Sequence, residues 1–321
     1  MKKILIASTA LVMVAGAASA DVKVTGQGYF GLSYDKDATV HTTLINRMQL
    51  DFAASKTTDS GLSFFGKFRA RSNKSAAATF NGGQVGVSAG GFTLAVGNVT
   101  DVYDASSLVY NSEIGICGCG GEALSVPYAT STSYGTGKNG VLASYTVGSL
   151  VVRGSYLQTN GDGKNGEWGI GVEDKFGAFS VAAGYVKGAA TSSYSYTVSG
   201  TGTATTVTGK SSTTASYKGA YLAGEYALGK SNVGLLLGHN SSADNNDNGT
   251  IATLYGNTTF GATTVAAFIS HASAEMTGET TKTTYGVGAS YDLGSGAAMV
   301  GHVRTDRTKD VLGDLGVTFK F

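Results

Sequence analysis

The 321-residue chain contains one proline, one tryptophan and two cysteines, and only 14% of its residues are charged. Because proline removes a donor from a β-ladder, its near absence leaves the chain free to form long uninterrupted strands. Two cysteines are too few for a disulfide-stapled scaffold. The formal net charge of +1 excludes the strongly basic surface of a nucleic-acid-binding protein.

Long hydrophobic runs are missing as well. Beyond the first twenty residues, no apolar stretch approaches the ~20 residues of a membrane-spanning helix. The amino-terminal stretch has Lys2 and Lys3, an apolar segment at 4–18, and the small residues Ala18, Ser19 and Ala20. This pattern predicts a cleaved secretory signal peptide at 1–20 and a single mature domain at 21–321. A retained membrane anchor is the alternative, and the short apolar segment argues against it.

What the chain has in abundance is glycine and tyrosine, with 48 and 17 residues, and a regular alternation of apolar and polar positions. The alternation is clearest in the last eleven residues, VLGDLGVTFKF, where Asp314, Thr318 and Lys320 occupy the polar parity. Strand side chains point to opposite faces with period two, so this segment is a strand with one apolar and one polar face. Such a strand suits a barrel with lipid outside and water inside. A soluble β-sandwich is the alternative.

Alternation and turn residues together predict about sixteen strands, most of them near the ~10 residues of a tilted membrane strand. We expect them at 22–34, 40–54, 62–72, 84–89, 92–99, 139–147, 150–158, 167–176, 178–187, 215–228, 232–239, 251–260, 262–272, 282–293, 297–304 and 311–321. Tight glycine-bearing connections alternate with longer polar segments along the whole chain. This asymmetry favours an all-β transmembrane antiparallel barrel over a sandwich, with tight periplasmic turns and long external loops.

The parity of each strand assigns its side chains to the two faces. The outward sets are apolar, for example Met48, Leu50 and Phe52. The inward sets are polar, and they include Lys23, Thr25, Gln27, Arg47, Gln49, Asp51, Lys67, Arg69, Arg71, Arg153, Ser155, Glu173, Lys175, His302 and Arg304. Because inward faces of this polarity cannot form a dry core, we expect water to fill the interior.

Four segments carry a family resemblance: TTDSGL at 57–62, FGATTV at 260–265, YGVGASYDL at 285–293 and DLGVTFKF at 314–321. With them the chain resembles the general diffusion porins of alphaproteobacterial outer membranes. The resemblance implies sixteen strands, a homotrimer surrounded by outer-membrane lipid and lipopolysaccharide, and a third external loop folded into the lumen. Here the third long connection, 100–138, is also the longest.

A constriction follows from the residues themselves, because a sixteen-stranded barrel leaves an aqueous channel that must be narrowed if it is to sieve solutes. The long third loop contains the carboxylates Asp101, Asp104, Glu113 and Glu122, while inward positions of early strands contain Arg47, Lys67, Arg69 and Arg71. Opposed carboxylates and cations would set up a transverse field across a narrow passage. Alternatively, these bases are solvated lumen residues away from the narrowest point. The small number of loop acids predicts weak ion selectivity.

The same loop contains both cysteines, Cys117 and Cys119. A disulfide at this spacing closes a small, strained ring that is easily reduced. Inert thiols and a soft-metal site are the alternatives, although two ligands without a nearby histidine fall short of a metal site. Loop carboxylates can hold calcium, but no spacing here predicts it, and we expect no cofactor.

The sequence thus predicts an outer-membrane channel for passive diffusion of ions and small hydrophilic solutes, and no enzyme. The alternative is a surface adhesin or substrate-specific receptor acting through its external loops. A Ser-His-acid triad is a third reading that sequence alone leaves open. Two matches to a dinucleotide-binding pattern, at 135–140 and 161–166, open no helix after a buried strand and carry no weight.

Overall fold

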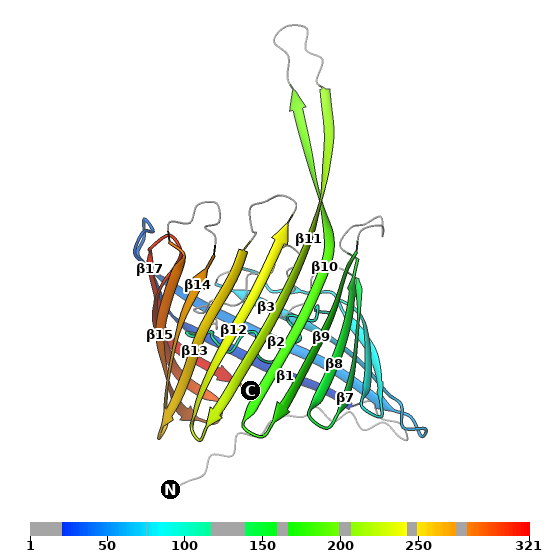
Figure 1. Ribbon diagram of the computed structural model, residues 1–321, viewed down its shortest axis with the longest axis horizontal. Coiled ribbons are helices and arrows are strands. Elements are labelled where there is room, and N and C mark those ends of the chain that lie inside the picture. The colour runs from blue at the N-terminus through cyan, green and yellow to red at the C-terminus, as the bar shows by residue number, and fades with distance from the viewer. Residues whose placement is uncertain are drawn as a thin grey trace.

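In the computed structural model, residues 21–74, 76–116, 139–158, 166–198, 207–242, 249–273 and 281–321 are described, and their strands form one antiparallel sheet of seventeen strands that closes on itself (Figure 1). One of these, β4 (Thr79–Phe80), has only two residues, so sixteen strands make the barrel wall. No helix in the described part of the chain is long and apolar enough to cross a membrane.

The wall strands follow one another in chain order around the barrel. They are β1 (Asp21–Asp35), β2 (Thr42–Thr57), β3 (Ser63–Asn73), β5 (Gln84–Ala89), β6 (Phe92–Gly97), β7 (Gly140–Val147), β8 (Leu150–Leu157), β9 (Glu167–Phe176), β10 (Phe179–Val198), β11 (Val207–Leu228), β12 (Ser231–Ser242), β13 (Gly249–Phe260), β14 (Thr263–Ala272), β15 (Thr283–Gly294), β16 (Ala297–Thr305) and β17 (Val311–Lys320).

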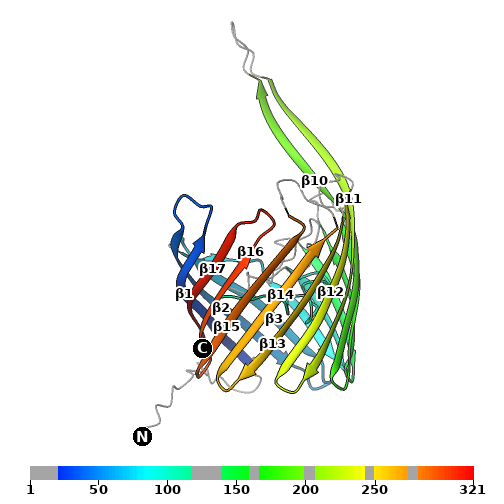
Figure 2. The same ribbon diagram turned by 60° about the vertical axis from the view of Figure 1, so that its left-hand side comes forward.

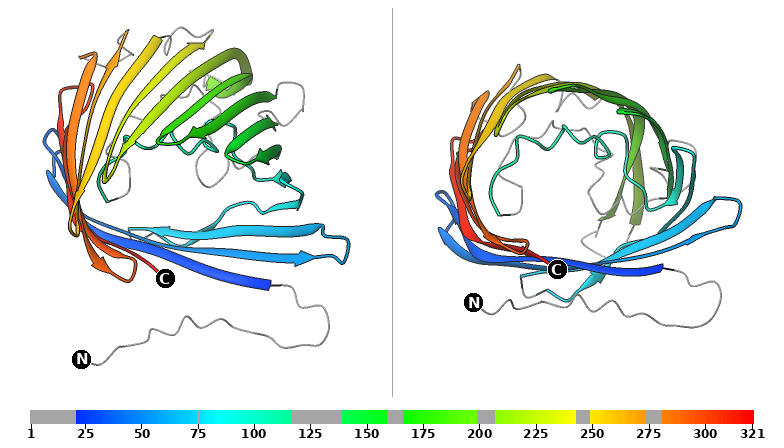
Figure 3. Two further views of the ribbon diagram at one scale, coloured as in Figure 1. Left: turned by 60° about the horizontal axis from the view of Figure 1, so that its bottom comes forward. Right: turned by 90° about the horizontal axis from the view of Figure 1, so that it is seen from below.

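The barrel closes between its first and last strands (Figure 3). β1 pairs with β17 from Gln27 opposite Lys320 to Asp35 opposite Leu312. Beyond the ladder, the main-chain N–H of Phe321 donates to the carbonyl of Gly26 at 2.9 Å, and the N–H of Gly26 donates back at 2.7 Å. The predicted terminal strand is therefore confirmed, and it forms the seam that leaves no sheet edge facing lipid.

The predicted strands and the alternation of short and long connections are confirmed, with one correction in the hairpin of β10 and β11. We expected 188–214 to be an external loop, but β10 continues to Val198 and β11 begins at Val207, with these two residues opposite one another. β9 pairs with β10 only as far as Lys187, and β12 pairs with β11 only as far as Tyr217. The hairpin therefore projects beyond the barrel as a two-stranded ribbon (Figures 1 and 2).

The two faces of the wall differ as parity predicts. Apolar side chains at outward positions are exposed, as in Ile170 at 59% and Leu315 at 58%, whereas the inward Gln49 is 1% exposed. Aromatic residues gather near strand ends on the outward face, including Phe176 and Phe179 beside one turn and Trp168 at the opposite end of β9. Amphipathic and aromatic rings suit the two membrane interfaces, so the outer surface fits a lipid bilayer.

Candidate pore constriction

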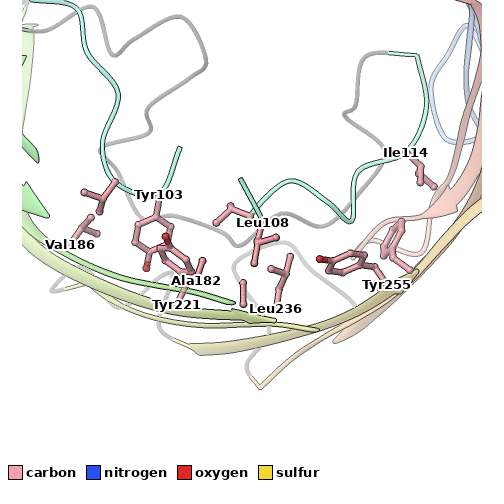
Figure 4. Packing of buried hydrophobic residues seen from close by; sticks show 12 residues of the cluster. Tyr103, Leu108, Ile114, Ala182, Val186, Tyr221, Leu236 and Tyr255 are labelled. Carbon is pink, nitrogen blue, oxygen red and sulfur yellow. The ribbon is translucent and has the colours of Figure 1, made fainter. Parts of the chain in front are cut away.

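The segment that follows β6 runs inside the barrel along the wall (Figure 3). We call its described residues, 100–116, the inner loop. It contributes five buried apolar side chains to a cluster completed by inward residues of β10 to β14 (Figure 4). The cluster contains Val102, Tyr103, Leu108, Val109 and Ile114 of the loop and Ala182, Val186, Tyr221, Ala223, Leu236, Tyr255 and Phe268 of the wall. Burial of this apolar surface fixes the loop to one side of the bore.

Polar contacts add to this apolar attachment in the middle of the inner loop. The main-chain N–H of Ser107 donates to Oε2 of Glu173 on β9 at 3.1 Å, and the Ser107 hydroxyl donates to the other carboxylate oxygen. Arg153 on β8 also donates to Oε2 of Glu173, at 3.1 Å. Further along, Nδ2 of Asn111 donates to Oε2 of Glu225 on β11 at 2.8 Å. Inward carboxylates of the wall therefore hold the loop by hydrogen bonds.

The last described turn of the inner loop rests on a histidine–aspartate pair. Nδ1 of His302 on β16 lies 2.8 Å from Oδ1 of Asp314 on β17, and both side chains are less than a tenth exposed. The second carboxylate oxygen of Asp314 accepts the N–H of Ile116 at 3.0 Å. Gly115 has φ +91°, and a Cβ there would collide with Nδ1 of His302. Only glycine satisfies both the backbone angle and the space at this point.

Glycines of the wall let the loop approach closely. A Cβ on Gly169 of β9 would lie 2.8 Å from Val102, one on Gly219 of β11 would lie 2.8 Å from the Tyr103 hydroxyl, and one on Gly288 of β15 would lie 3.0 Å from Ile114. Each distance is shorter than the ~3.5 Å at which carbon atoms attract one another best. These wall positions therefore exclude side chains so that the loop can lie flat against the strands.

Across the bore, the inward faces of β2 and β3 form the basic wall predicted from the sequence. Arg69 pairs with Asp51, and Nε of Arg71 donates to Oε1 of Gln49 at 3.1 Å. The amide of Gln49 in turn donates to Asp51 at 2.6 Å. Cross-strand partners thus orient two guanidinium groups in one hydrogen-bonded ladder.

The other two predicted bases flank this ladder. Nε of Arg47 donates to Oδ1 of Asn73 at 2.7 Å, and its guanidinium carbon lies 5.0 Å from the ring centroid of Tyr29, within cation–π range. Lys67 lies on the opposite side of the ladder, where it lines a cavity together with Lys23 and Arg69. The structure therefore brings all four predicted bases to one wall.

Two of the predicted loop acids form a second, acidic group. Tyr110 donates its hydroxyl to Oδ1 of Asp104 at 2.6 Å. Burial raises the pKa of Asp104, while the Tyr110 hydrogen bond and the positive charge of Arg69 partly offset this rise. Burial, together with the negative charge of Asp104, raises the pKa of Glu113 to about 7. Asp104 therefore lies within the electrostatic influence of the basic wall.

The structure does not place Asp101 with this group. Asp101 is fully buried, and its Oδ1 accepts the main-chain N–H groups of Tyr103 and Asp104, both at 2.9 Å. We correct the expectation for this residue, because a carboxylate that holds the turn of its own loop does not face the bore. Glu122 and the predicted cysteine pair, Cys117 and Cys119, lie outside the described residues.

The sequence analysis missed the wall residues that hold the loop. Glu225 and Asp314 are inward carboxylates whose partners come from the loop, and Tyr221, Tyr255 and Phe268 are inward aromatic residues on strands whose lumen face should be polar. These aromatic residues at positions where the alternation predicts polar ones were the sequence signal that could have revealed the attachment of the loop. An aromatic ring on a water-facing side of a barrel indicates that another segment covers it.

Three comparisons with known proteins agree with this fold. The family model described as Gram-negative porin matches residues 7–311. The chain is 27% identical over 318 residues to a porin of Fuscovulum blasticum and 29% identical over 323 residues to a porin of Rhodobacter capsulatus, in each case across 94% of this chain and 100% of the relative. A solved mutant of the Rh. blastica porin superposes with a TM-score of 0.74 at 25% identity, covering 94% of this chain and 100% of that one.

Proposed function

Because the chain belongs to the Gram-negative porin family and is thus a β-barrel channel of the outer membrane, we propose that its inner loop narrows the bore into a field-lined constriction for ions and small hydrophilic solutes. The chain is not an enzyme. The observation that carries the proposal is the attachment of the inner loop to the inner side of β10 to β14, and we infer that Asp104 and Glu113 of this loop face the basic wall.

The proposed mechanism is diffusion through a transverse field. Arg47, Lys67, Arg69 and Arg71 supply positive charge on one side, and Asp104 and Glu113 supply negative charge on the other. Polar solutes align their dipoles with such a field. Apolar solutes must displace the water ordered by the field in the constriction, and they form no favourable electrostatic interaction in return. Because the basic ladder already contains Asp51 as a partner of Arg69, we expect only weak preference between cations and anions.

The test is conductance and ion reversal potential in planar bilayers, before and after the double substitution Arg69→Gln and Arg71→Gln. We expect the reversal potential to shift toward cation preference and the single-channel conductance to change. Lys230→Gln is the control, since Lys230 lies in the tight turn between β11 and β12 and its substitution removes one positive charge away from the bore. An unchanged reversal potential in the double variant would place these arginines off the permeation path.

We propose a homotrimer as the assembly, as the resemblance to diffusion porins implies. Outward apolar faces such as those of β1 and β2, with Phe30, Leu44 and Met48 exposed, suit a neighbouring barrel as well as lipid. Chemical cross-linking in mild detergent tests this, and a species no larger than one chain would contradict it.

Lipopolysaccharide is the proposed partner at the external rim of β10 and β11. Lys187 and Lys218 are both exposed and lie directly opposite one another, and Trp168 is the β9 partner of Lys187. Like charges at opposed positions repel one another unless an anion lies between them, and lipid phosphates supply that anion. Binding of lipopolysaccharide should weaken in Lys187→Gln with Lys218→Gln, and equal retention by this double variant and the wild type would exclude the site.

The second candidate function is that of a surface adhesin or a substrate-specific receptor. The observation that favours it is the ribbon of β10 and β11, which extends beyond the rim of the barrel (Figure 2). Deletion of residues 189–214 tests it. We expect conductance to persist, and loss of cell attachment or of uptake of one specific solute would support the second function.

A further inference from the structure

One row of inward residues runs across the first wall strands on the periplasmic side of the arginine ladder. Lys23 of β1 lies opposite Ala53 of β2, Ala53 lies opposite Lys67 of β3, and Lys67 lies opposite Gln84 of β5. Residues directly opposite one another share a face of the sheet. Two lysines therefore flank an alanine, whose methyl group leaves the space between them open.

A cavity lies over this row. It has a volume of about 340 Å³ and is lined by Lys23, Lys67 and Gln84, by Asn98 just after β6, and by Thr100 at the start of the inner loop. This volume is at the lower end of the range for small-molecule sites. The lining combines ammonium, amide and hydroxyl groups, which are the donors that bind oxyanions.

The charge of the cavity is positive. Arg69 also lines it, but Arg69 is paired with Asp51, the single carboxylate in the lining. Among the described residues, Lys23 and Lys67 form no ion pair. Their main chains are separated by two strand spacings, or about 10 Å. Lysine stems are long and flexible, so both ammonium groups reach a single anion placed over Ala53.

We propose that Lys23 and Lys67 form a binding site for small oxyanions with two negative charges, such as inorganic phosphate or a short dicarboxylate. The site lies one row closer than Arg69 to the tight turn at 58–62, so it occupies the end of the basic wall nearest that turn. The inference rests on the proposed function in one respect, namely that solutes pass along the basic wall. It adds a binding site for dianions to a channel that otherwise prefers cations or anions only weakly.

The probe is inorganic phosphate, added to the full-length protein in planar bilayers at constant ionic strength and neutral pH. We expect phosphate to reduce the chloride current in a saturable way. Lys23→Gln and Lys67→Gln should each raise the half-blocking phosphate concentration about tenfold, which is the effect of one lost charge-assisted hydrogen bond. Lys23→Arg and Lys67→Arg keep the charge, and their half-blocking concentrations should stay within about threefold of the wild type.

The matched control is Lys175→Gln. Lys175 is an exposed lysine of β9 near the tight turn at Gly177, and it does not line this cavity. Its loss should leave the phosphate block unchanged. A wild-type channel that conducts potassium chloride without any saturable phosphate block would overturn the site and leave the channel function intact. The absence of ion current in potassium chloride alone would instead defeat the proposed function. An equal loss of phosphate block in Lys175→Gln would show that the block depends on the total charge of the lumen, and it would overturn the specific site.

Discussion

The main-chain N–H of Ile116 donates a hydrogen bond of 3.0 Å to Oδ2 of Asp314, a residue 198 positions later in the chain. This bond joins the inner loop to β17, the strand that closes the barrel with β1. Because the other oxygen of Asp314 lies 2.8 Å from Nδ1 of His302, the loop rests on a carboxylate that is already fixed in place. One side chain of the closing strand therefore contacts the inner loop directly.

Gly115→Ala should displace the inner loop. Alanine at φ +91° is strained, and its Cβ would lie 2.8 Å from Oδ2 of Asp314 and collide with His302. Gly177→Ala is the control, because Gly177 has φ +62° but nothing within 4 Å of an added Cβ. Both variants carry the ~1–2 kcal/mol of a left-handed alanine, so only Gly115→Ala should increase open-channel noise in single-channel recordings. Equal noise in both variants would show that the contact with Asp314 does not fix the loop.

Tyr103→Ala should detach the opposite end of the inner loop. Tyr103 is 1% exposed, and its ring centroid lies 4.5 Å from that of Tyr221. Truncation of a buried aromatic ring costs about 3–5 kcal/mol, and most of that cost should fall on the docking of the loop. We expect larger and noisier single-channel conductance. The control is Tyr145→Ala, because Tyr145 lies on the outward face and is 50% exposed, and this variant should leave the conductance unchanged. Equal conductance changes in both variants would contradict this role for Tyr103.

Asp51→Asn should shift the ion preference of the channel toward anions. Asp51 is the carboxylate partner of Arg69, so its neutralisation leaves the guanidinium charge without that partner. A unit charge acting at ~10 Å through water changes the energy of an ion by ~0.4 kcal/mol, or about twofold in the permeability ratio. Reversal potentials in a potassium chloride gradient measure this ratio. Asp59→Asn, in the exposed turn at 58–62, is the control, and a shift of the same size in both variants would refute a local effect.

Ion preference should depend on pH through Glu113, whose pKa is raised to about 7 by burial and by the charge of Asp104. The carboxyl group is ionised above this pKa and neutral below it, so the loop loses one negative charge as the pH falls from about 8 to about 6. The preference for cations should decrease over that interval. The comparison with Glu113→Gln isolates the contribution of Glu113 from that of every other group in the protein. A pH profile that is identical in the two proteins would contradict the assignment.

The alternation of apolar and polar residues along the chain was enough to predict the barrel, because a shift of one residue in a strand would turn every outward apolar side chain toward the water-filled lumen. It was not enough to predict the ribbon of β10 and β11. There the serine and glycine residues indicated a loop. In the structure, β10 and β11 pair without interruption from Phe179 opposite Tyr226 to Val198 opposite Val207, so the strands continue beyond the part of the barrel that separates lipid from the lumen. The alternation of apolar and polar residues arises because the two faces of a strand meet different surroundings. It is therefore absent where a hairpin extends beyond the barrel into water.

The candidate site was predictable in its residue types and only partly in its geometry. Inward parity placed Arg69 and Arg71 on one wall, because the strands fix their direction. The inner loop has no such period, and so Asp101 and Asp104 looked equivalent in the sequence. In the structure Asp101 holds main-chain N–H groups of its own turn, whereas Asp104 accepts a hydrogen bond from the hydroxyl of Tyr110.

Gly169, Gly219 and Gly288 have a consequence for how this channel can change. A methyl group at any of these strand positions would crowd the inner loop and push it away from the wall. Under the proposed function, such a substitution would reduce the size of the solutes that pass, while leaving every charged group in place.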